Sequence, residues 1–529
     1  MKNFVSITTR RIAALVVLVF FVGALLTACG SSATSSNPRL GGTFRLGLSN
    51  VDSLDPADAS SIEELLVADQ LFDGLTRWDP ISLEPISSIA KAWSASPDQK
   101  TFDFTLRTDA TFSNGRLVTA ADIKYSMERV SRKDSTSPFA ELLTPVAGYI
   151  GWHVDADLAG LAGVAVIDAQ HLRISLDEPW SVLPSVLASP IFGTVARESV
   201  EQASPPFAEQ PVGSGPFSFS SRDSDGTLTF AATTSGGAHV DDLEIHMYGS
   251  QETSYEAFTN GDVDWSRVPP ALSSVAAKKY GDSAMRPYFA VLYYGVNLKN
   301  PELSDRRFRE AIVRSIDREK IASDVFGNTV NAITGVVPKG VPGAQSDPCR
   351  SRCGYDATLA ADLIKQSYTL RAPPAVYLDY DKDPTQEAIA TAMRDGLAQA
   401  GIPATLRPHE PQEYGAFVQG GQASLFRLGW TANYPSADAF LTPLFRSNES
   451  GNLVGLKDPD VDAALTKGRS VADAGARDNA YQLAEAQIMD QFAVIPVAQF
   501  KLFSVENKKV HDLTVTGMGT FDATKVWLS

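Results

Sequence analysis

Side chains that can do chemistry are sparse in this 529-residue chain, and the cysteines are the first to consider. Cys349 and Cys353 lie four positions apart, between Pro348 and Gly354. Two thiols at this spacing can close a small loop as a disulfide, or they can supply two ligands to a metal. A metal site would need further ligands from elsewhere in the chain, because zinc takes four. We therefore expect a disulfide between Cys349 and Cys353, and no metal.

No residue pattern typical of an enzyme accompanies these thiols. Ser214 lies between Gly213 and Gly215, but a nucleophile elbow requires Gly-x-Ser-x-Gly between a strand and a helix. The segment from Pro216 onward alternates like a strand, so we interpret the two glycines as a tight turn. The sequence contains no phosphate-loop or zinc-helix motif, and its six histidines are scattered singly. We predict a protein that is not an enzyme and that has no cofactor.

The third cysteine, Cys29, ends a segment typical of exported proteins. Lys2, Arg10 and Arg11 precede an apolar run over residues 12–26, which is shorter than the ~20 residues that span a bilayer. The run leads into Leu-Thr-Ala-Cys, which resembles a lipobox, the signal for attachment of a diacylglyceryl group to the thiol. Two acyl chains anchor a protein stably, whereas one chain binds a membrane only marginally.

We predict that residues 1–28 are a signal peptide, that Cys29 is lipidated, and that residues 29–37 are a flexible tether. The small polar residues that follow Cys29 support the tether. A plain signal peptide with a chance cysteine is the alternative. The adjacent arginines leave twin-arginine export open beside the general route.

The composition indicates a large, acidic globular body. Hydrophobic residues make up 44% and charged residues 20%, which is typical of a folded protein with a sizeable core, and the length allows two to four domains. The formal net charge is −16. This sign argues against binding to nucleic acid, and against docking of the body itself on anionic lipids.

Strand-like and helix-like segments alternate along the body. Alternating apolar residues predict strands over residues 42–48, 102–107, 167–176 and 494–498. Helical spacing predicts helices over residues 62–71, 119–129, 302–326, 386–400 and 480–492. Thr119 and Ser304 are expected to cap the second and third of these helices, and Gly401 to end the fourth. The fold class is α/β or α+β with more than one lobe.

Six blocks of sequence resemble the extracytoplasmic solute-binding proteins of peptide and nickel ABC importers. They lie at residues 112–129, 211–217, 255–264, 297–321, 429–435 and 458–462. The second block reads Pro-Val-Gly-Ser-Gly-Pro-Phe, and the fourth, which begins at Asn297, is the most similar. Because six such blocks occur in the family's order, the chain is identified as a member of this family.

The resemblance implies an α/β fold, a two-lobed periplasmic-binding-protein-like clamp with an additional domain on the first lobe. The first lobe would combine residues 38–80, 205–285 and 496–529. Residues 81–204 would form the additional domain, and residues 286–495 the second lobe. A ligand that contacts both lobes only in the closed form would drive the hinge shut by its differential affinity.

The resemblance also implies a function. The chain would capture oligopeptides outside the cell and deliver them to the permease subunits of an ABC importer. It would work as a monomer, lipid-anchored on the extracytoplasmic face of the cell membrane. Members that bind peptides hold the ligand extended, so backbone hydrogen bonds common to all peptides supply the affinity.

At one position the chain departs from the family's pattern. Peptide-binding members typically carry an aspartate after Gly-Trp-x-x, where it pairs with the α-ammonium of the peptide, and this chain has Asn433. Either another acid replaces it, with Asp438 the nearest candidate, or the ligand lacks a free amino terminus. An acylated or cyclic peptide would satisfy the second interpretation.

Other candidate ligand-binding residues come from the same comparison. Arg427 matches a position where some members place an arginine near the ligand carboxylate, and a guanidinium suits that group. Trp430 and Tyr434 are expected to line the cleft, with Tyr293 and Asn297 as weaker candidates. Each also has a plain structural interpretation as an ion-pair or core residue.

Three alternatives remain open at this point. The same fold can bind a nickel chelate, haem or an oligosaccharide instead of a peptide. A secreted hydrolase would need a catalytic group that the sequence does not reveal. A sensor or adhesion lipoprotein would keep the clamp without an importer.

Overall fold

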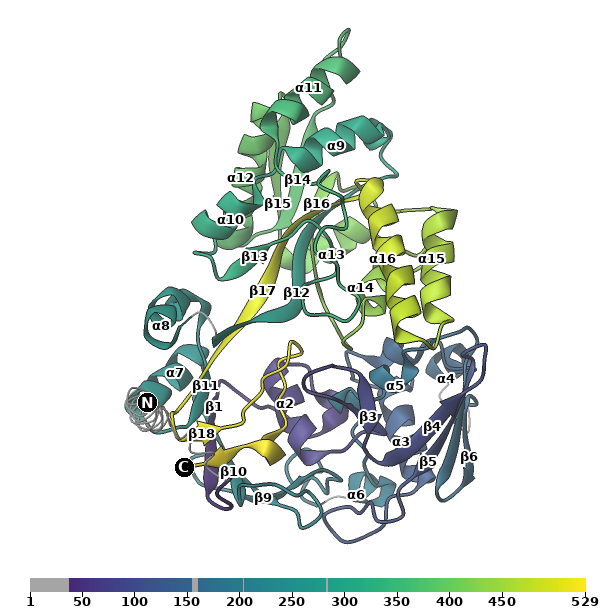
Figure 1. The fold of residues 1–529 in the computed structure, drawn as a ribbon, viewed down its shortest axis with the longest axis vertical. Helices are drawn as coiled ribbons and strands as arrows, with labels where there is room; N and C mark the ends of the chain where they lie inside the picture. The colour runs from purple at the N-terminus through teal and green to yellow at the C-terminus, as the bar shows by residue number, and fades with distance from the viewer. Residues whose placement is uncertain (1–37, 155–159, 203, 282–283) are drawn as a thin grey trace, which may run out of the picture. The chain divides into compact units, whose positions relative to one another are not determined.

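A mixed sheet of eleven strands runs through the chain and contains most of its β-structure. The computed structural model describes residues 38–154, 160–202, 204–281 and 284–529 (Figure 1). The predicted signal peptide, Cys29 and the predicted tether lie outside these residues. The strand order is β15-β14-β16-β12-β17-β11-β1-β10-β9-β8, with β13 paired to β17. The strands are β1 (Thr43–Leu48), β8 (Phe217–Arg222), β9 (Leu228–Ala232), β10 (Asp242–Met247), β11 (Trp265–Arg267), β12 (Met285–Val296), β13 (Val330–Ala332), β14 (Val376–Asp381), β15 (Ala404–His409), β16 (Leu425–Thr431) and β17 (Val494–Glu506).

Two long strands, β12 and β17, connect the two halves of this sheet. β17 pairs with β12 as far as Phe503 and then with β11 over its last three residues, from Ser504 to Glu506. Figure 1 shows the two strands side by side between the upper and lower groups of strands. Their register shifts between Pro287 and Val291, which marks a bulge. The two halves are therefore joined by paired β-strands that bend at an irregular point.

The half built on β1 has its own apolar core. Phe44, Phe217, Phe230, Trp265 and Phe521 are buried together in it. Its helices are α2 (Ile62–Leu71), α7 (Gln251–Asn260) and α8 (Ser273–Tyr280), and the short strands β18 (Val510–His511) and β19 (Trp527–Leu528) close the chain.

A separate four-stranded sheet lies within the part predicted as the additional domain. Its order is β4-β5-β7-β6, from β4 (Ala90–Ala95), β5 (Thr101–Leu106), β6 (Val164–Asp168) and β7 (His171–Ser175). A hairpin of β2 (Thr76–Trp78) and β3 (Pro85–Ser87) precedes it. The helices of this region are α3 (Ala120–Ser131), α4 (Tyr149–Val154), α5 (Leu183–Val186) and α6 (Arg197–Glu201).

The half built on β12, β14, β15 and β16 carries most of the helices. They are α9 (Arg306–Arg314), α10 (Arg318–Asp324), α11 (Ala357–Ser367), α12 (Pro384–Gln399), α13 (Pro411–Gln419), α14 (Asp438–Phe445), α15 (Pro459–Arg469) and α16 (Ala474–Asp490). Cys349 and Cys353 are joined by a disulfide, as predicted. Both cysteines are buried, whereas Arg350 and Ser351 in the loop that they close are exposed.

Most predicted elements are present, and two are wrong in a specific way. The single helix expected over residues 302–326 is two helices, α9 and α10. Asp305, rather than Ser304, caps the first, and Asp317 caps the second by accepting from the Lys320 amide at 3.0 Å. The buried Arg318 donates to carbonyl oxygens at the end of α9, so it satisfies groups that a continuous helix would have bonded itself.

The second error concerns the strand expected over residues 167–176. This segment contains the end of β6, a turn and β7, because Asp168 accepts from the Gln170 amide at 2.8 Å and reverses the chain. Smaller differences are an earlier start of α16, at Ala474, and a longer β17. None of the described helices has the length and apolar character that crossing a bilayer would require.

Candidate ligand-binding cleft

Two cavities meet at the C-terminal end of β16, and they share Phe139, Thr431 and Asn433. The larger measures about 480 Å³ and is lined by β12, β16 and Phe500 of β17. The smaller measures about 220 Å³ and reaches Ile62 of α2 in the other half of the sheet. The cleft is therefore built from both halves of the sheet together with Phe139 of the four-stranded region.

The backbone of β16 is open along one edge where it lines the larger cavity. The Ala432 amide donates to the Phe289 carbonyl at 2.8 Å, so Ala432 and every second residue before it face β12. Gly429 and Thr431 must then direct their N–H and C=O groups to the opposite side. β14 occupies that side only as far as Phe426, and among the described residues no strand continues beyond it. Gly429 and Thr431 are exposed.

Arg427 lies on the same strand, at the start of this open edge. Its Nη1 is 3.6 Å from Oδ1 of Asp381, which is an ion pair but too long for a hydrogen bond. Nε of Arg427 and Oδ1 of Asp381 are both buried atoms that make no hydrogen bond within the described part of the chain. Arg427 Nη2 lies 4.0 Å from the position that a Cβ of Gly429 would occupy, so no side chain at Gly429 covers the guanidinium. The guanidinium therefore retains unused donors beside the cavity.

Asn433 and Trp430 also line the cleft. Asn433 is half-buried and touches both cavities. Trp430 lines the larger cavity, and its Nε1 donates to the Ala439 carbonyl at 2.6 Å. Of the candidates named from the sequence, Arg427, Trp430 and Asn433 are thus brought together.

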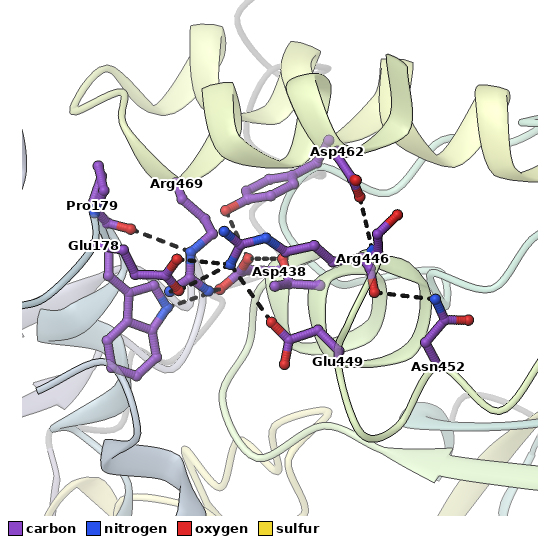
Figure 2. Close-up of polar contacts among 12 residues, drawn as sticks. Glu178, Pro179, Asp438, Arg446, Glu449, Asn452, Asp462 and Arg469 are labelled. Carbon is purple, nitrogen blue, oxygen red and sulfur yellow. Dashed lines mark hydrogen bonds and ion pairs between the residues drawn. The ribbon is translucent and has the colours of Figure 1, made fainter. Parts of the chain in front are cut away.

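Asp438 lies apart from the cleft and is fully buried (Figure 2). Its carboxylate accepts hydrogen bonds from Trp180 Nε1 at 2.9 Å, from the hydroxyls of Tyr434 and Tyr481 at 3.0 Å, and from Thr442 at 2.5 Å. Nη1 of Arg469 is 3.5 Å away. The carboxylate is surrounded by donors of this chain and does not face either cavity.

This network joins residues that are far apart in the sequence. Arg469 bonds Glu178 at 2.9 Å, and Arg446 approaches the same carboxylate at 2.8 Å (Figure 2). The Ser181 amide donates to the Arg469 carbonyl at 2.8 Å. Residues 178–181, which follow the four-stranded sheet, are therefore bound to helices α14 and α15.

The ionisation of the network follows from its burial and its charges. Burial alone would raise the pKa of Asp438, but the positive charge of Arg469 and the donated hydrogen bonds outweigh it and lower that pKa. Burial also raises the pKa of Tyr434 and of Tyr481 well above the ordinary value. At neutral pH the network therefore contains an ionised Asp438 and two neutral phenols.

Tyr293, Asn297 and Tyr434 have positions typical of scaffold residues. Tyr293 is 2% exposed in β12, and Tyr434 is 5% exposed within the network of Asp438. The Asn297 side chain donates to the carbonyls of Gly421 and Ala423 at 3.0 and 2.7 Å. None of the three lines the two cavities.

Several lining residues were missed at the sequence level. Gly429 and Thr431 follow Arg427 at intervals of two, so strand periodicity was a signal that could have found them. Phe139, Tyr288 and Met518 carried no comparable signal, because each reaches the cleft from a distant part of the chain. Within the described ranges, no group of three His, Cys, Asp or Glu side chains could hold a metal ion.

Comparison with known proteins agrees with this architecture. Residues 84–452 match the family of bacterial extracellular solute-binding proteins, family 5. The chain is 24% identical over 480 residues to the dipeptide-binding protein DppE of Bacillus subtilis, and 25% identical over 470 residues to the periplasmic oligopeptide-binding protein OppA of Escherichia coli. Both alignments cover 85% of this chain and 85% of the relative.

Solved structures show the same fold. The unliganded open form of the periplasmic murein tripeptide binding protein MppA superposes with a TM-score of 0.83 at 22% identity, covering 93% of this chain and 99% of that one. The two-lobed α/β fold predicted from the sequence is thus confirmed. Because the family match spans more than half of its residues, this chain belongs to the family 5 extracellular solute-binding proteins of bacteria.

Proposed function

We propose that the chain captures oligopeptides outside the cell membrane and passes them to the permease of an ABC importer. Membership of the solute-binding family supports the role, and relatives named for dipeptide and oligopeptide binding support the ligand. The observation that carries the proposal is the open edge of β16 at Gly429 and Thr431, which lies in a cavity.

An extended peptide would add to this edge as a further strand. The N–H and C=O groups of Gly429 and Thr431 are common partners for any peptide backbone, so affinity would depend little on the side chains of the ligand. Arg427 would receive a carboxylate, because a guanidinium can bind both of its oxygens. Ligand side chains would occupy the two cavities, with Trp430 as an apolar wall and water filling the remaining space.

The buried candidates would act differently. We assign Asp438 and Tyr434 to the network that holds helix α14, and Tyr293 and Asn297 to the support of β12. They would position the strand and the turn that carry Arg427 and Asn433 without touching ligand. Variants at these four residues are therefore expected to change stability before they change ligand affinity.

Closure of the clamp would take place about β12 and β17. We propose that the first lobe combines residues 38–80, 205–285 and 496–529, and that residues 286–495 form the second lobe. The two strands would cross between these lobes. The bulge near Pro287 lies at the crossing, where a change of backbone angles disturbs few hydrogen bonds. Residues 81–204 would form the additional domain.

The membrane attachment is proposed from the sequence alone. Cleavage before Cys29 and acylation of its thiol would anchor the protein on the extracytoplasmic face of the cell membrane, as a monomer. A Cys29→Ala variant should be absent from the membrane fraction. Mass spectrometry should find acyl chains on the mature N-terminus of the unchanged protein and none on the variant. A variant that stays in the membrane fraction would contradict the anchor.

The peptide-binding role is tested by recovering the natural ligand. The mature body, without the tether, would be purified, and the molecules released by mild denaturation would be identified by mass spectrometry. Short peptides of varied sequence are the expected result, and the same peptides should rebind without being cleaved. A single non-peptide ligand would keep the fold and family but refute the proposed substrate, and cleavage products would refute the expectation of a non-enzyme.

A further inference from the structure

The two cavities that meet at Asn433 have only one charged side chain in their walls. Arg427 lines the larger cavity, and among the residues that the structure describes no acidic one lines either cavity. The smaller cavity is bounded mainly by apolar or aromatic side chains, among them Ile62, Leu65 and Trp78. The cleft therefore offers a cation at one place, an apolar pocket at another, and the neutral amide of Asn433 between them.

Acids close to the cleft are already engaged elsewhere. Glu63, which follows the lining residue Ile62, is paired with Arg267 at 3.0 Å. Asp438 is 0% exposed and accepts hydrogen bonds from four side chains, besides the charge of Arg469. Asp381 stands beside the guanidinium of Arg427 and does not line either cavity. An ammonium group placed at Asn433 would leave water and meet only neutral acceptors, which is unfavourable for a charge.

A narrow crevice adjoins the smaller cavity and has to be considered as well. It measures about 60 Å³, and its acids are Asp69, Asp73 and Asp522. Trp78 stands between the two spaces, held by its indole N–H, which donates to the Ser185 carbonyl at 2.8 Å. Burial, together with the neighbouring carboxylates, raises the pKa of Asp69 to about 7, so this group is a weak counter-charge at neutral pH. Arg77 also lines the crevice, 3.8 Å from the carboxylate of Asp522, and burial raises the pKa of Asp73. A crevice this narrow, with its own cation, is a poor substitute for a carboxylate at Asn433.

We infer that the cleft selects peptides with an uncharged amino end and a free carboxylate, such as N-acylated peptides. The inference rests on the proposed function and specifies its substrate class. The capped end would lie in the apolar pocket next to Asn433, whose amide can bond to an acyl carbonyl or an amide N–H. The carboxylate would lie at Arg427, and the backbone between them along Gly429 and Thr431.

A competition between matched peptide libraries tests this inference. Random libraries of one length would be prepared in four forms, with the amino end free or acetylated and the carboxyl end free or amidated. The mature body would be equilibrated with an equimolar mixture, and the retained peptides counted by mass spectrometry. We expect the acetylated form with a free carboxylate to exceed the free-amine form by about tenfold or more.

Each other result has a definite meaning. Preference for free amines would overturn the inference but keep the proposed function. Retention of none of the four forms would refute peptide binding itself, so the two failures are distinguishable. If free amines are preferred and an Asp69→Asn variant abolishes that preference, the crevice rather than the Asn433 pocket holds the ammonium.

Variants at Asn433 provide the matched control. Asn433→Asp restores a carboxylate and should shift the preference toward free amines by about tenfold. Asn433→Ser removes the amide without adding charge, so it should weaken binding of capped peptides but should not reverse the preference for them. If Asn433→Asp leaves the ratio of the two forms unchanged, the amino end does not lie at this residue and the inference is wrong.

Discussion

Residues 427–433 and residues 434–442 are consecutive, yet they use their polar groups in opposite ways. In the first segment, Gly429 and Thr431 leave an open backbone edge, and the guanidinium of Arg427 has donors to spare. In the second, both oxygens of Asp438 are occupied by donors of the same chain. Open hydrogen-bonding capacity marks the part available to a ligand, and filled capacity marks the part that holds the fold.

The largest effect on stability is expected for a change of Asp438, whose hydrogen-bonding capacity is filled. Asp438→Ala should destabilise the protein by about 3–5 kcal/mol, because Arg469 would lose its buried partner and several donors would be left unbonded. The urea midpoint of the mature body measures this. Since the pKa of Asp438 is lowered in the folded protein, its stabilisation is present above about pH 4 and is lost as the pH falls below it.

Asp223→Ala is a matched control, because Asp223 is exposed. It should change the stability by no more than about 0.5 kcal/mol. Equal urea midpoints for the two variants would show that the network around Asp438 contributes nothing, and the contrast between the segments would fail.

A change at Arg427 should weaken ligand binding and leave the stability nearly unchanged. Arg427→Gln is expected to weaken binding of peptides with a free carboxylate by roughly 10- to 100-fold, since a charged hydrogen bond is lost. The urea midpoint should stay nearly constant. Calorimetric titration with amidated peptides is the control, and an equal loss for amidated and free forms would contradict a role in carboxylate binding.

A change in the backbone of β16 is expected to have a smaller effect. Thr431→Pro removes one N–H from the open edge, where proline is tolerated, and should reduce the affinity for all peptides by about tenfold. Thr431→Val keeps the N–H and should bind normally. If both variants bind alike, the open edge does not carry the ligand backbone.

A further prediction concerns Asp69, an acid that belongs neither to the open edge of β16 nor to the network around Asp438. The pKa of Asp69 is raised in the folded protein, so the folded state holds this proton more tightly than the unfolded state. The resulting loss of folding stability is absent below about pH 4 and grows as the pH rises toward about 7. Asp69→Asn should therefore raise the stability of the protein at pH 8 and have little effect at pH 4. Thermal unfolding at the two pH values measures the difference, and equal shifts at both would contradict it.

The fold was largely predictable because its signals are local or repeated in order. The alternation over residues 42–48, the cap of α3 at Thr119 and the stop at Gly401 after α12 depend on neighbours in the sequence. The break between α9 and α10 was missed, because the carbonyls that Arg318 bonds become visible only in three dimensions.

The cleft was predictable only in part, for the same reason. Arg427, Trp430 and Asn433 share one strand and the turn that follows it. The sequence block at residues 429–435 contains Trp430 and Asn433, and Arg427 lies two residues before it. The burial of Asp438 depends on Trp180 and Arg469, each from another part of the chain. The proximity of Asp438 to Asn433 in the sequence therefore did not predict that it is buried. Sequence distance was a poor guide to which acid could face the ligand.

The position of β17 has a consequence for how the molecule is made. This strand lies in the middle of the eleven-stranded sheet, between β12 and β11, yet it is among the last segments to be synthesised. Neither half can complete its pairing until residues beyond Val494 emerge, so the strand pairing that joins the two halves forms only after translation is nearly finished. A chain that completes its fold late stays unfolded for longer, and an unfolded chain can pass through a translocation channel. A truncation before β17 would leave two exposed strand edges, which are prone to aggregation.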